Sequence, residues 1–363
     1  MPGAFQDCSP DRWGRNLIAK RHRQAREEQR QADLNDVDFL IGVSDQTRQG
    51  ALRFTHGGSD SFLDPYNRVP KLIELPRLVA AVDQLGDSDD EFGAVKTLLD
   101  AGSGSLGGAR PKASVRDRDG NLAIAKFPHG DDEWNVIRWE CVTLDIAERA
   151  GIATPHRELV PMSDGRGVLV LRRFDRTDRQ FRIPYISAMT LLAATDGDWH
   201  DYTEVGEHLT DVSAAAGADL RDLYRRVAFN VAVHNTDDHL RNLGFLWVRG
   251  GWCLAPAFDI NPSPDPARQR VTGIAGATHG HDEPTGLADL ARTCRLTSDQ
   301  VQRIHDDINY AVSSWRTSAS RRGISSKEIE RFANAFTSLP NPEIVAREPS
   351  QPPNAPSTSS PAV

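Results

Sequence analysis

The stretch HNTDDHLRNLGFL, residues 234–246, gathers two carboxylates, two histidines and two carboxamides directly before an apolar run. Asp237 and Asn242 stand five residues apart within it. Asp and Asn side chains often bind nearby backbone groups in turns, so the stretch by itself is also compatible with a well-capped loop. The same side chains suit a general base and a ligand for a hard metal ion. The following segment bears on the choice between the two interpretations.

That segment predicts a β-hairpin, two apolar runs joined by a turn: Leu243–Val248, Arg249–Gly251 and Trp252–Pro256. Because an antiparallel hairpin brings its outer ends together, Asp259 is expected beside Asn242. With Asp237 this makes one carboxylate base, one neutral oxygen ligand and one anionic ligand. Mg²⁺ prefers such hard oxygen donors, whereas His234 and His239 lack a third ligand at a spacing typical of zinc sites.

A glycine-rich segment, GSGSLGGARPKASV, contains the pattern GxGxxG from Gly102 to Gly107, which by itself is a weak signal. A dinucleotide-binding loop would follow a strand and open a helix, but here a helix-like run precedes the pattern and an extended segment with Pro111 follows. No Gly-Lys-Ser/Thr closes a Walker loop. What remains is a loop leading into a strand, as kinases use to lay backbone N–H groups over ATP phosphates.

Lys126 lies in the apolar segment NLAIAKFP, residues 121–128. A buried ammonium is costly unless it meets an anion such as a phosphate or a carboxylate, although a lysine at a strand end can also extend to water. Glu140, on the following predicted helix, could form the ion pair that aims a kinase lysine at the phosphates. Glu133 and Glu148 are the competing candidates.

We expect an α+β protein with the two lobes of a protein kinase, a small β-containing N-lobe and a larger, mostly helical C-lobe. The chain divides into four predicted parts: a helical region over 1–100, the N-lobe with the glycine-rich loop and hinge over 101–180, the C-lobe over 181–339 and a disordered tail over 340–363. The tail is rich in Pro, Ser and Ala with no apolar period.

The periodicity of apolar residues predicts individual helices, each with a start or stop signal nearby. A β-turn is expected at Asp119–Gly120, and Gly151 marks one helix end. Capping-type starts occur at Ser9–Asp11 and Asn35–Asp36. The expected helices are 70–82, 131–150, 214–233 and 298–315.

Composition excludes several classes of protein. The 363 residues carry a formal net charge of -8, which argues against a chain-wide nucleic-acid surface, although residues 12–30 are locally basic. The four cysteines form no CxxC pair, so a disulfide framework is not indicated and a reducing cytoplasm fits. No run approaches the roughly 18–20 apolar residues that span a bilayer, so we expect a cytoplasmic protein with no membrane partner.

Five motifs, in this order, resemble the HipA family of toxin-antitoxin serine/threonine kinases: SLGGARPK, AIAKFP, LVLRRFDR, NTDDHLRN and LAPAFDI. The resemblance covers roughly residues 10–335. It implies that Asp237 is the catalytic base, that Asn242 and Asp259 hold Mg²⁺, and that Lys126 binds ATP phosphates. Longer family members carry a small β-rich domain before the segment resembling SPDRWGRNLI, and that domain is expected to be lost, separately encoded or missed at the assigned start.

The resemblance also implies further ATP contacts and a modification site. Lys112 and the loop residues would cover the phosphates, His239 would face the nucleotide, and Arg172 to Phe174 would form the hinge that meets adenine. Ser105 would be the autophosphorylated serine of the loop, with Ser103 as the neighbouring candidate. The loop residues concerned are Gly107, Gly108, Ala109 and Arg110.

As family properties, the resemblance implies a protein substrate such as an aminoacyl-tRNA synthetase, growth arrest on its phosphorylation, and neutralisation by a DNA-binding antitoxin. DNA would be reached only through that antitoxin. Two other functions remain open. The spacing of Asp237, His239 and Asn242 also occurs in lipid and small-molecule kinases, and the chain could instead be a non-catalytic co-repressor that acts with a DNA-binding partner.

Overall fold

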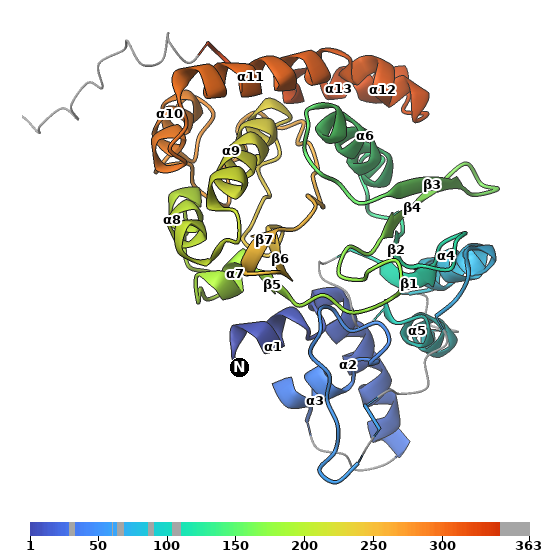
Figure 1. Cartoon of the computed structure of the whole chain (residues 1–363). Helices are drawn as coiled ribbons and strands as arrows, with labels where there is room; N and C mark the ends of the chain where they lie inside the picture. Colours follow the sequence, from blue (N-terminus) through green and yellow to red (C-terminus); the bar gives the residue numbers. More distant parts are fainter. Residues whose placement is uncertain (29–32, 60, 64–68, 86–90, 104–109, 342–363) are drawn as a thin grey trace, which may run out of the picture.

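The computed structural model forms two lobes, a smaller one built on an antiparallel sheet and a larger, mostly helical one (Figure 1). The predicted α+β class is therefore confirmed. The predicted tail lies almost wholly outside the described residues. Among the described residues, no helix is both long and apolar enough to cross a membrane. The structure describes residues 1–28, 33–59, 61–63, 69–85, 91–103 and 110–341.

The sheet of the smaller lobe has the strand order β1-β2-β4-β3, all antiparallel. Its first hairpin turns at Gly120, whose positive φ of 84° suits a residue without a Cβ. The register pairs Lys112 with Lys126, so these two side chains project from the same face of the sheet. The strands are β1 (Lys112–Arg116), β2 (Leu122–Lys126), β3 (Arg157–Pro161) and β4 (Gly167–Arg172).

Buried side chains of helices α2 (Arg12–Glu28), α4 (Leu75–Asp83) and α5 (Glu91–Asp100) share one core with Val115, Ala125 and Val170 of this sheet. Asn35 begins α3 with a capping box, as its position in the sequence indicates. Before the sheet the described helices are α1 (Gly3–Asp7), α2 (Arg12–Glu28), α3 (Asp36–Ile41), the 3₁₀ turn Leu72–Glu74, α4 (Leu75–Asp83) and α5 (Glu91–Asp100).

The larger lobe contains the predicted hairpin, in which Phe245 pairs with Leu254. A third strand, which the sequence analysis does not predict, joins it to give the order β5-β6-β7. Helices surround this small sheet (Figure 1). The elements are β5 (Tyr185–Ser187), α7 (Ala188–Leu191), α8 (Tyr202–Val212), α9 (Ala216–Ala232), β6 (Gly244–Val248), β7 (Gly251–Leu254), α10 (Glu283–Thr293), α11 (Ser298–Ser313), α12 (Trp315–Arg321), α13 (Ser326–Arg331) and the 3₁₀ turn Ala333–Ala335.

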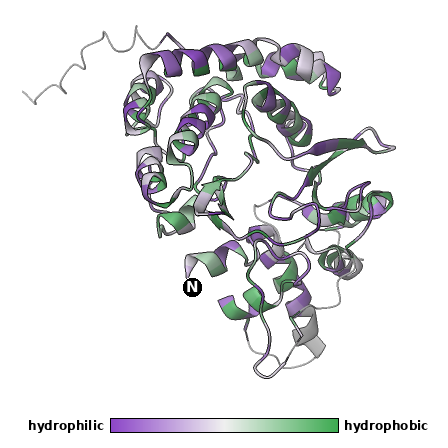
Figure 2. Ribbon diagram, in the orientation of Figure 1, coloured by the Kyte–Doolittle hydropathy of each residue, from purple (hydrophilic) through white to green (hydrophobic). Residues whose placement is uncertain are grey.

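Helix α6 (Val136–Arg149) connects the two lobes and starts later than the helix predicted over 131–150. The reason is local, because the Asn135 side chain caps the helix by accepting a hydrogen bond from Arg138 N. Side chains of α6 belong to the same core as the C-lobe helices, and Leu171 of the sheet joins that core. Figure 2 shows hydrophobic residues concentrated on α4 and α6 and hydrophilic residues along the outer side of α11.

Candidate active site

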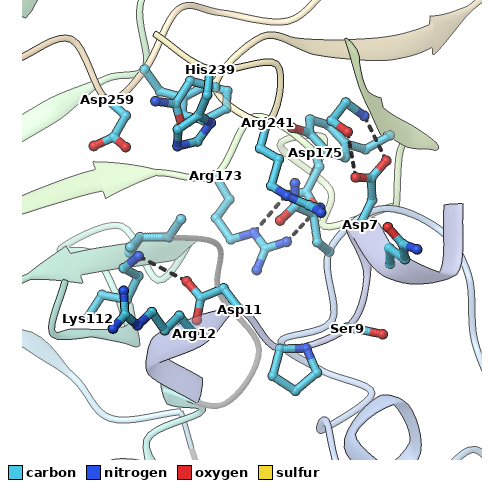
Figure 3. A pocket seen from close by; sticks show the side chains of 18 of the residues that line it. Asp7, Ser9, Asp11, Arg12, Lys112, Arg173, Asp175, His239, Arg241 and Asp259 are labelled. Atoms are coloured by element: carbon cyan, nitrogen blue, oxygen red, sulfur yellow. Dashed lines mark hydrogen bonds and ion pairs between the residues drawn. The ribbon is translucent and has the colours of Figure 1, made fainter. Parts of the chain in front are cut away.

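A cavity of about 730 Å³ lies where the two lobes meet, a volume typical of small-molecule and cofactor sites. Its walls include Lys112 and Lys126 from the sheet and His239, Asn242 and Asp259 from the C-lobe. Figure 3 shows Lys112, His239 and Asp259 among the side chains around this cavity. These five residues, which four separate motifs contribute, are thus brought to one cavity. The N-terminal residues form a further part of the wall.

Lys126 is the centre of the ionic contacts in this cavity. Its Nζ lies 2.6 Å from Glu140 Oε1 and 2.7 Å from Asp259 Oδ1. Burial would lower the pKa of Lys126, but the two carboxylates outweigh burial and hold it above its ordinary value. Burial and the nearby Asp259 raise the pKa of Glu140 against the attraction of Lys126. The lysine is therefore a fixed ammonium, and Glu140 is its partner on α6; Glu133 and Glu148 pair elsewhere, with Arg331 and Arg157.

Asp259 follows strand β7 in a left-handed backbone conformation, with φ of 58°. A non-glycine residue pays strain energy there, and such strain is concentrated at functional sites. Burial acts to raise the pKa of its carboxyl, but Lys126 and Lys112 outweigh that effect and keep it below its ordinary value. Asn261 Nδ2 donates to Asp259 Oδ1 at 3.3 Å. Asp259 is thus an ionised carboxylate that faces the cavity.

Lys112 lies beside Lys126 on the sheet and is almost completely buried, with 4% of its side chain exposed. Its Nζ lies 3.3 Å from Oδ2 of Asp11. Burial lowers the pKa of Lys112, and the neighbouring Lys126 ammonium lowers it further. The carboxylates of Asp11 and Asp259 act to raise this pKa but do not offset the other two effects. Two ammonium groups directly opposite each other are unfavourable by themselves, and an anionic ligand would relieve their repulsion.

The polar stretch of the C-lobe divides between the cavity and the solvent. His239 and Asn242 line the cavity, and His239 Nδ1 is buried with no hydrogen-bond partner among the described residues. Asp237 is not one of the lining residues; its side chain is 60% exposed, 3.4 Å from Arg268. Asn242 Nδ2 donates to the backbone oxygen of Asp237 at 3.4 Å. A carboxylate in this position is accessible from outside the cavity.

Asp238, the second carboxylate of the stretch, has a structural role. It accepts hydrogen bonds from the Tyr202 hydroxyl and, at 2.6 Å, from Asn230 Nδ2, and burial raises its pKa. Arg270 reinforces the same loop by donating to the backbone oxygen of Asn235 at 2.9 Å. These buried contacts hold the backbone on both sides of Asp237 in place.

The predicted hinge, Arg172 to Phe174, follows strand β4 at the cavity wall. The amide N–H of Arg172 donates to His156 O and that of Arg173 to Leu122 O, so these two groups are occupied. Within the predicted hinge, Phe174 is therefore the residue left to meet a ligand through its backbone N–H. Its ring packs 5.5 Å, centroid to centroid, from that of Phe258.

The structure describes only part of the glycine-rich loop. The predicted ATP contacts Gly107, Gly108 and Ala109 and the predicted phosphosite Ser105 lie outside the described residues. Arg110 is described and forms an ion pair with Asp132; it is not one of the residues that line the cavity. The alternative phosphosite, Ser103, is completely buried, and its hydroxyl has no partner among the described residues.

Sequence reasoning missed two acidic residues near the cavity. Asp11 was interpreted only as part of a capping signal, yet it binds Lys112. Asp175 is buried between Arg173 and Arg176 and also accepts the backbone N–H of Gly50 at 2.8 Å. A signal for Asp175 existed, because it stands between arginines in the motif LVLRRFDR. Asp11 had no comparable signal.

Comparison with protein families now identifies the chain. Residues 104–315 match the family model described as the HipA-like C-terminal domain, which is more than half of the chain. The chain belongs to the HipA family. A Haemophilus influenzae relative of this HipA-family chain, named "Putative kinase", is 25% identical over a 234-residue alignment that covers 58% of this chain and 66% of that relative.

Two solved structures share the fold of this HipA-family protein. Shewanella oneidensis HipA, solved in a complex with HipB and its operator DNA, has a TM-score of 0.61 at 14% identity, over 92% of this chain and 85% of that chain. The Helicobacter pylori proinflammatory kinase CtkA has a TM-score of 0.50 at 18% identity, over 63% of this chain and 87% of that chain. The kinase-like, two-lobed fold is therefore confirmed.

The side chains present fit a divalent cation. Asp259 and Asn242 offer a carboxylate and an amide oxygen to the same cavity, next to two ammonium groups suited to phosphate. The buried Oδ1 of Asn261, beside Asp259, has no hydrogen-bond partner among the described residues. A hydrated Mg²⁺ bound at Asp259 would give this orphaned oxygen a water to accept from.

Proposed function

We propose that this HipA-family chain is a serine/threonine protein kinase that uses ATP and Mg²⁺. The observation that carries the proposal is the shared contact of Lys126 with Glu140 and Asp259, at 2.6 and 2.7 Å, on the wall of a 730 Å³ cavity. Protein kinases require such a lysine–glutamate pair and a metal-binding aspartate beside it.

The roles of the side chains follow from their charges and positions. Lys126 and Lys112 would neutralise phosphate oxygens from the face of the sheet, and His239 would face the nucleotide from the C-lobe. Asp259 and Asn242 would hold Mg²⁺, which offsets the charge of the phosphates during transfer. Phosphoryl transfer depends mainly on this positioning and electrostatic stabilisation.

Asp237 would orient the attacking hydroxyl and accept its proton. Its 60% exposed carboxylate favours an acceptor that approaches from the surface, as a protein segment does, over a small molecule enclosed in the cavity. This exposure supports the protein-kinase assignment over the lipid or small-molecule alternative.

The loop serine proposed for autophosphorylation is Ser105. Of the two candidates, Ser103 is completely buried and therefore cannot reach an active site without local unfolding. A phosphate on the loop would add about -1.5 to -2 charges next to the phosphates of ATP, so its expected effect is inactivation.

The biological role that we propose is that of the toxin of a type II toxin-antitoxin system. Family membership supports it, as does the Shewanella relative, which was solved with HipB and operator DNA. The partner of this chain would accordingly be a DNA-binding antitoxin, with a small N-terminal-domain-like protein as a further candidate. The substrate would be a cytoplasmic protein such as an aminoacyl-tRNA synthetase, whose phosphorylation arrests growth.

The test is the intact mass of the protein after incubation with Mg·ATP. The wild type is expected to gain one phosphate, whereas Asp237→Ala and Ser105→Ala are expected to gain none. Because Asp237 is exposed, its replacement should leave the melting temperature unchanged, which separates lost chemistry from lost folding.

A wild-type protein that phosphorylates neither itself nor any protein in a cell extract contradicts the protein-kinase proposal. Phosphate transfer to lipid vesicles or a small hydroxyl compound alone would favour the lipid or small-molecule kinase. A chain that turns over no ATP but strengthens the repression of transcription by the antitoxin would favour the non-catalytic co-repressor.

A further inference from the structure

The first 16 residues, here called the N-terminal segment, precede the region that matches the family model, yet they form part of the cavity wall. Figure 3 shows Asp11 and Arg12 next to Lys112, with Asp7 and Ser9 farther along the same side. The segment therefore contributes charges to a site whose predicted chemistry comes entirely from residues 105–259. The lining residues are Met1, Gln6, Asp7, Ser9, Pro10, Asp11, Arg12, Arg15 and Asn16.

Contacts to both lobes hold the N-terminal segment in place. On the C-lobe, Asp7 accepts hydrogen bonds from the backbone N–H of Ser187 at 2.8 Å and from its hydroxyl at 2.6 Å. On the N-lobe, the indole N–H of Trp13 donates to Lys112 O at 3.2 Å. Asp11 lies between these two anchors in the chain, so its position is fixed with respect to strand β1.

Asp11 uses its two carboxylate oxygens for different partners. Oδ1 accepts the backbone N–H of Gly14 at 2.9 Å and so caps the start of α2. Oδ2 lies 3.3 Å from the Lys112 ammonium, and the side chains are only 15% and 4% exposed. Burial raises the pKa of Asp11 against the attraction of Lys112. The pair is thus an ion pair largely removed from water, formed across 101 residues of sequence.

We propose that Asp11 is a positioning residue, which holds the Lys112 ammonium where it can contact the phosphates of ATP. The cavity then contains two lysine–carboxylate pairs side by side, Lys126 with Glu140 and Lys112 with Asp11. The first comes from the family-matched region and the second depends on the N-terminal segment. This inference rests on the proposed kinase function.

The physical basis is the cost of a buried lysine. Lys112 lies opposite another ammonium, that of Lys126, on the same face of the sheet. A carboxylate partner offsets both the lost hydration and this repulsion, and it restricts a long, flexible side chain to one position. Without the charge of Asp11, Lys112 is expected to turn away from the cavity or to lose its proton, and either change weakens phosphate binding.

Two substitutions at one position separate the charge from the cap. Asp11→Asn keeps a good helix cap but removes the charge, whereas Asp11→Glu keeps the charge but caps poorly. The affinity for Mg·ATP, measured by isothermal titration calorimetry, is expected to fall about tenfold in Asp11→Asn, the effect of losing one charge-assisted contact. Asp11→Glu should recover most of that loss. The opposite order, with affinity lost only in Asp11→Glu, would show a purely structural cap and overturn the proposal.

A double-mutant cycle tests whether Asp11 acts through Lys112. Once Lys112→Met has removed the ammonium, adding Asp11→Asn should change the ATP affinity no further. Asp83→Asn is the matched control, since it breaks a different aspartate ion pair, to Arg166 at 2.7 Å, outside the cavity, and should leave the affinity unchanged. Additive losses in the cycle, or an affinity in Asp11→Asn equal to that of the wild type, contradict the positioning role.

Thermal unfolding of the four proteins of the cycle (the wild type, Asp11→Asn, Lys112→Met and the double variant) separates failure of the kinase function from failure of the positioning role. A wild type that binds no Mg·ATP removes the proposed function, and the positioning role falls with it. The other failure is a wild type that binds Mg·ATP but whose Asp11 and Lys112 substitutions are coupled only in the melting temperature and not in the ATP affinity. That result leaves the kinase function standing and overturns only the positioning role.

Discussion

At the scale of single residues, the candidate site is organised by buried lysines whose charge is offset by carboxylates. Lys126 has 11% of its side chain exposed and contacts both Glu140 and Asp259. A structural core would be equally stable, or more so, with an apolar side chain in that place, because burying ions is costly. A strained, ionised Asp259 beside it points the same way, toward a binding function for these charges.

The residue scale gives a direct prediction for Lys126. In Lys126→Met, the affinity for Mg·ATP should fall about tenfold to a hundredfold, since a hydrogen bond to a charged group contributes about 1.5–3 kcal/mol. Isothermal titration calorimetry measures this change. Lys96→Met, which alters an exposed lysine of α5, is the matched control. Equal affinities of Lys126→Met and the control would remove Lys126 from the phosphate site.

At the scale of elements, the β6–β7 hairpin determines where Asp259 lies. Its two strands pair in register, and Ala255 N donates to Gly244 O at 2.8 Å beyond the last paired residues. The outer ends of the hairpin therefore stay together, which brings both Asn242 and Asp259 to the cavity. The loop before the hairpin is held independently, by the hydrogen bonds that Asp238 accepts from Tyr202 and Asn230.

Gly251 at the start of β7 tests this arrangement. A Cβ there would lie 2.6 Å from Val212 O and 2.8 Å from Ala214 N, which are backbone atoms that cannot move aside. Gly251→Ala should therefore destabilise the protein by about 1–3 kcal/mol in urea unfolding, and phosphoryl transfer should fall because Asp259 follows this strand. In Gly217→Ala the new methyl group meets nothing within 4 Å, so neither property should decrease. Unchanged stability of Gly251→Ala would show that the hairpin is free to shift.

At the scale of the whole molecule, Asp175 connects the hinge to the N-terminal region. It pairs with Arg173 and Arg176, and it accepts the Gly50 N–H; Arg173 in turn donates to Thr47 O at 2.7 Å. Burial acts to raise the pKa of Asp175, but the two arginines outweigh burial and hold it below its ordinary value. This network ties the sheet, the hinge and residues 47–50 into one unit.

The sign of that pKa shift predicts how stability depends on pH. A carboxyl with a lower pKa in the folded state stabilises the fold above its unfolded pKa of about 3.9, and this contribution is lost as the pH falls below that value. At pH 7, Asp175→Asn should lose about 3–5 kcal/mol of unfolding free energy, because both arginines lose a buried partner. The difference from wild type should shrink toward pH 3 in urea titrations. The exposed pair of Asp83 should contribute at most about 1 kcal/mol at either pH.

The predictions made from sequence succeeded where the signal was local. The hairpin turn and the helix ends depend on short patterns of neighbouring residues. The hairpin, α9 and the helix near Ser298 lie close to their predicted ranges. The helix expected from Asp131 begins later because a single side chain, Asn135, caps it. Strand β5 is only three residues long and is defined by its pairing with β6. So short a segment shows no alternation of apolar and polar residues from which a strand could be predicted.

The amino-acid sequence by itself determined the fold class and the family motifs, and it indicated Glu140 as a partner of Lys126 while leaving Glu133 and Glu148 as competing candidates. Only the tertiary structure decided that Glu140 pairs with Lys126, that Asp237 faces outward, and that Asp11 reaches Lys112. The physical reason is that such contacts arise when whole elements pack together, and apolar periodicity shows which face of an element is buried but not which other element it meets. The sequence of the N-terminal segment indicated a helix start and no reactive group, yet the segment forms part of the wall of the candidate site.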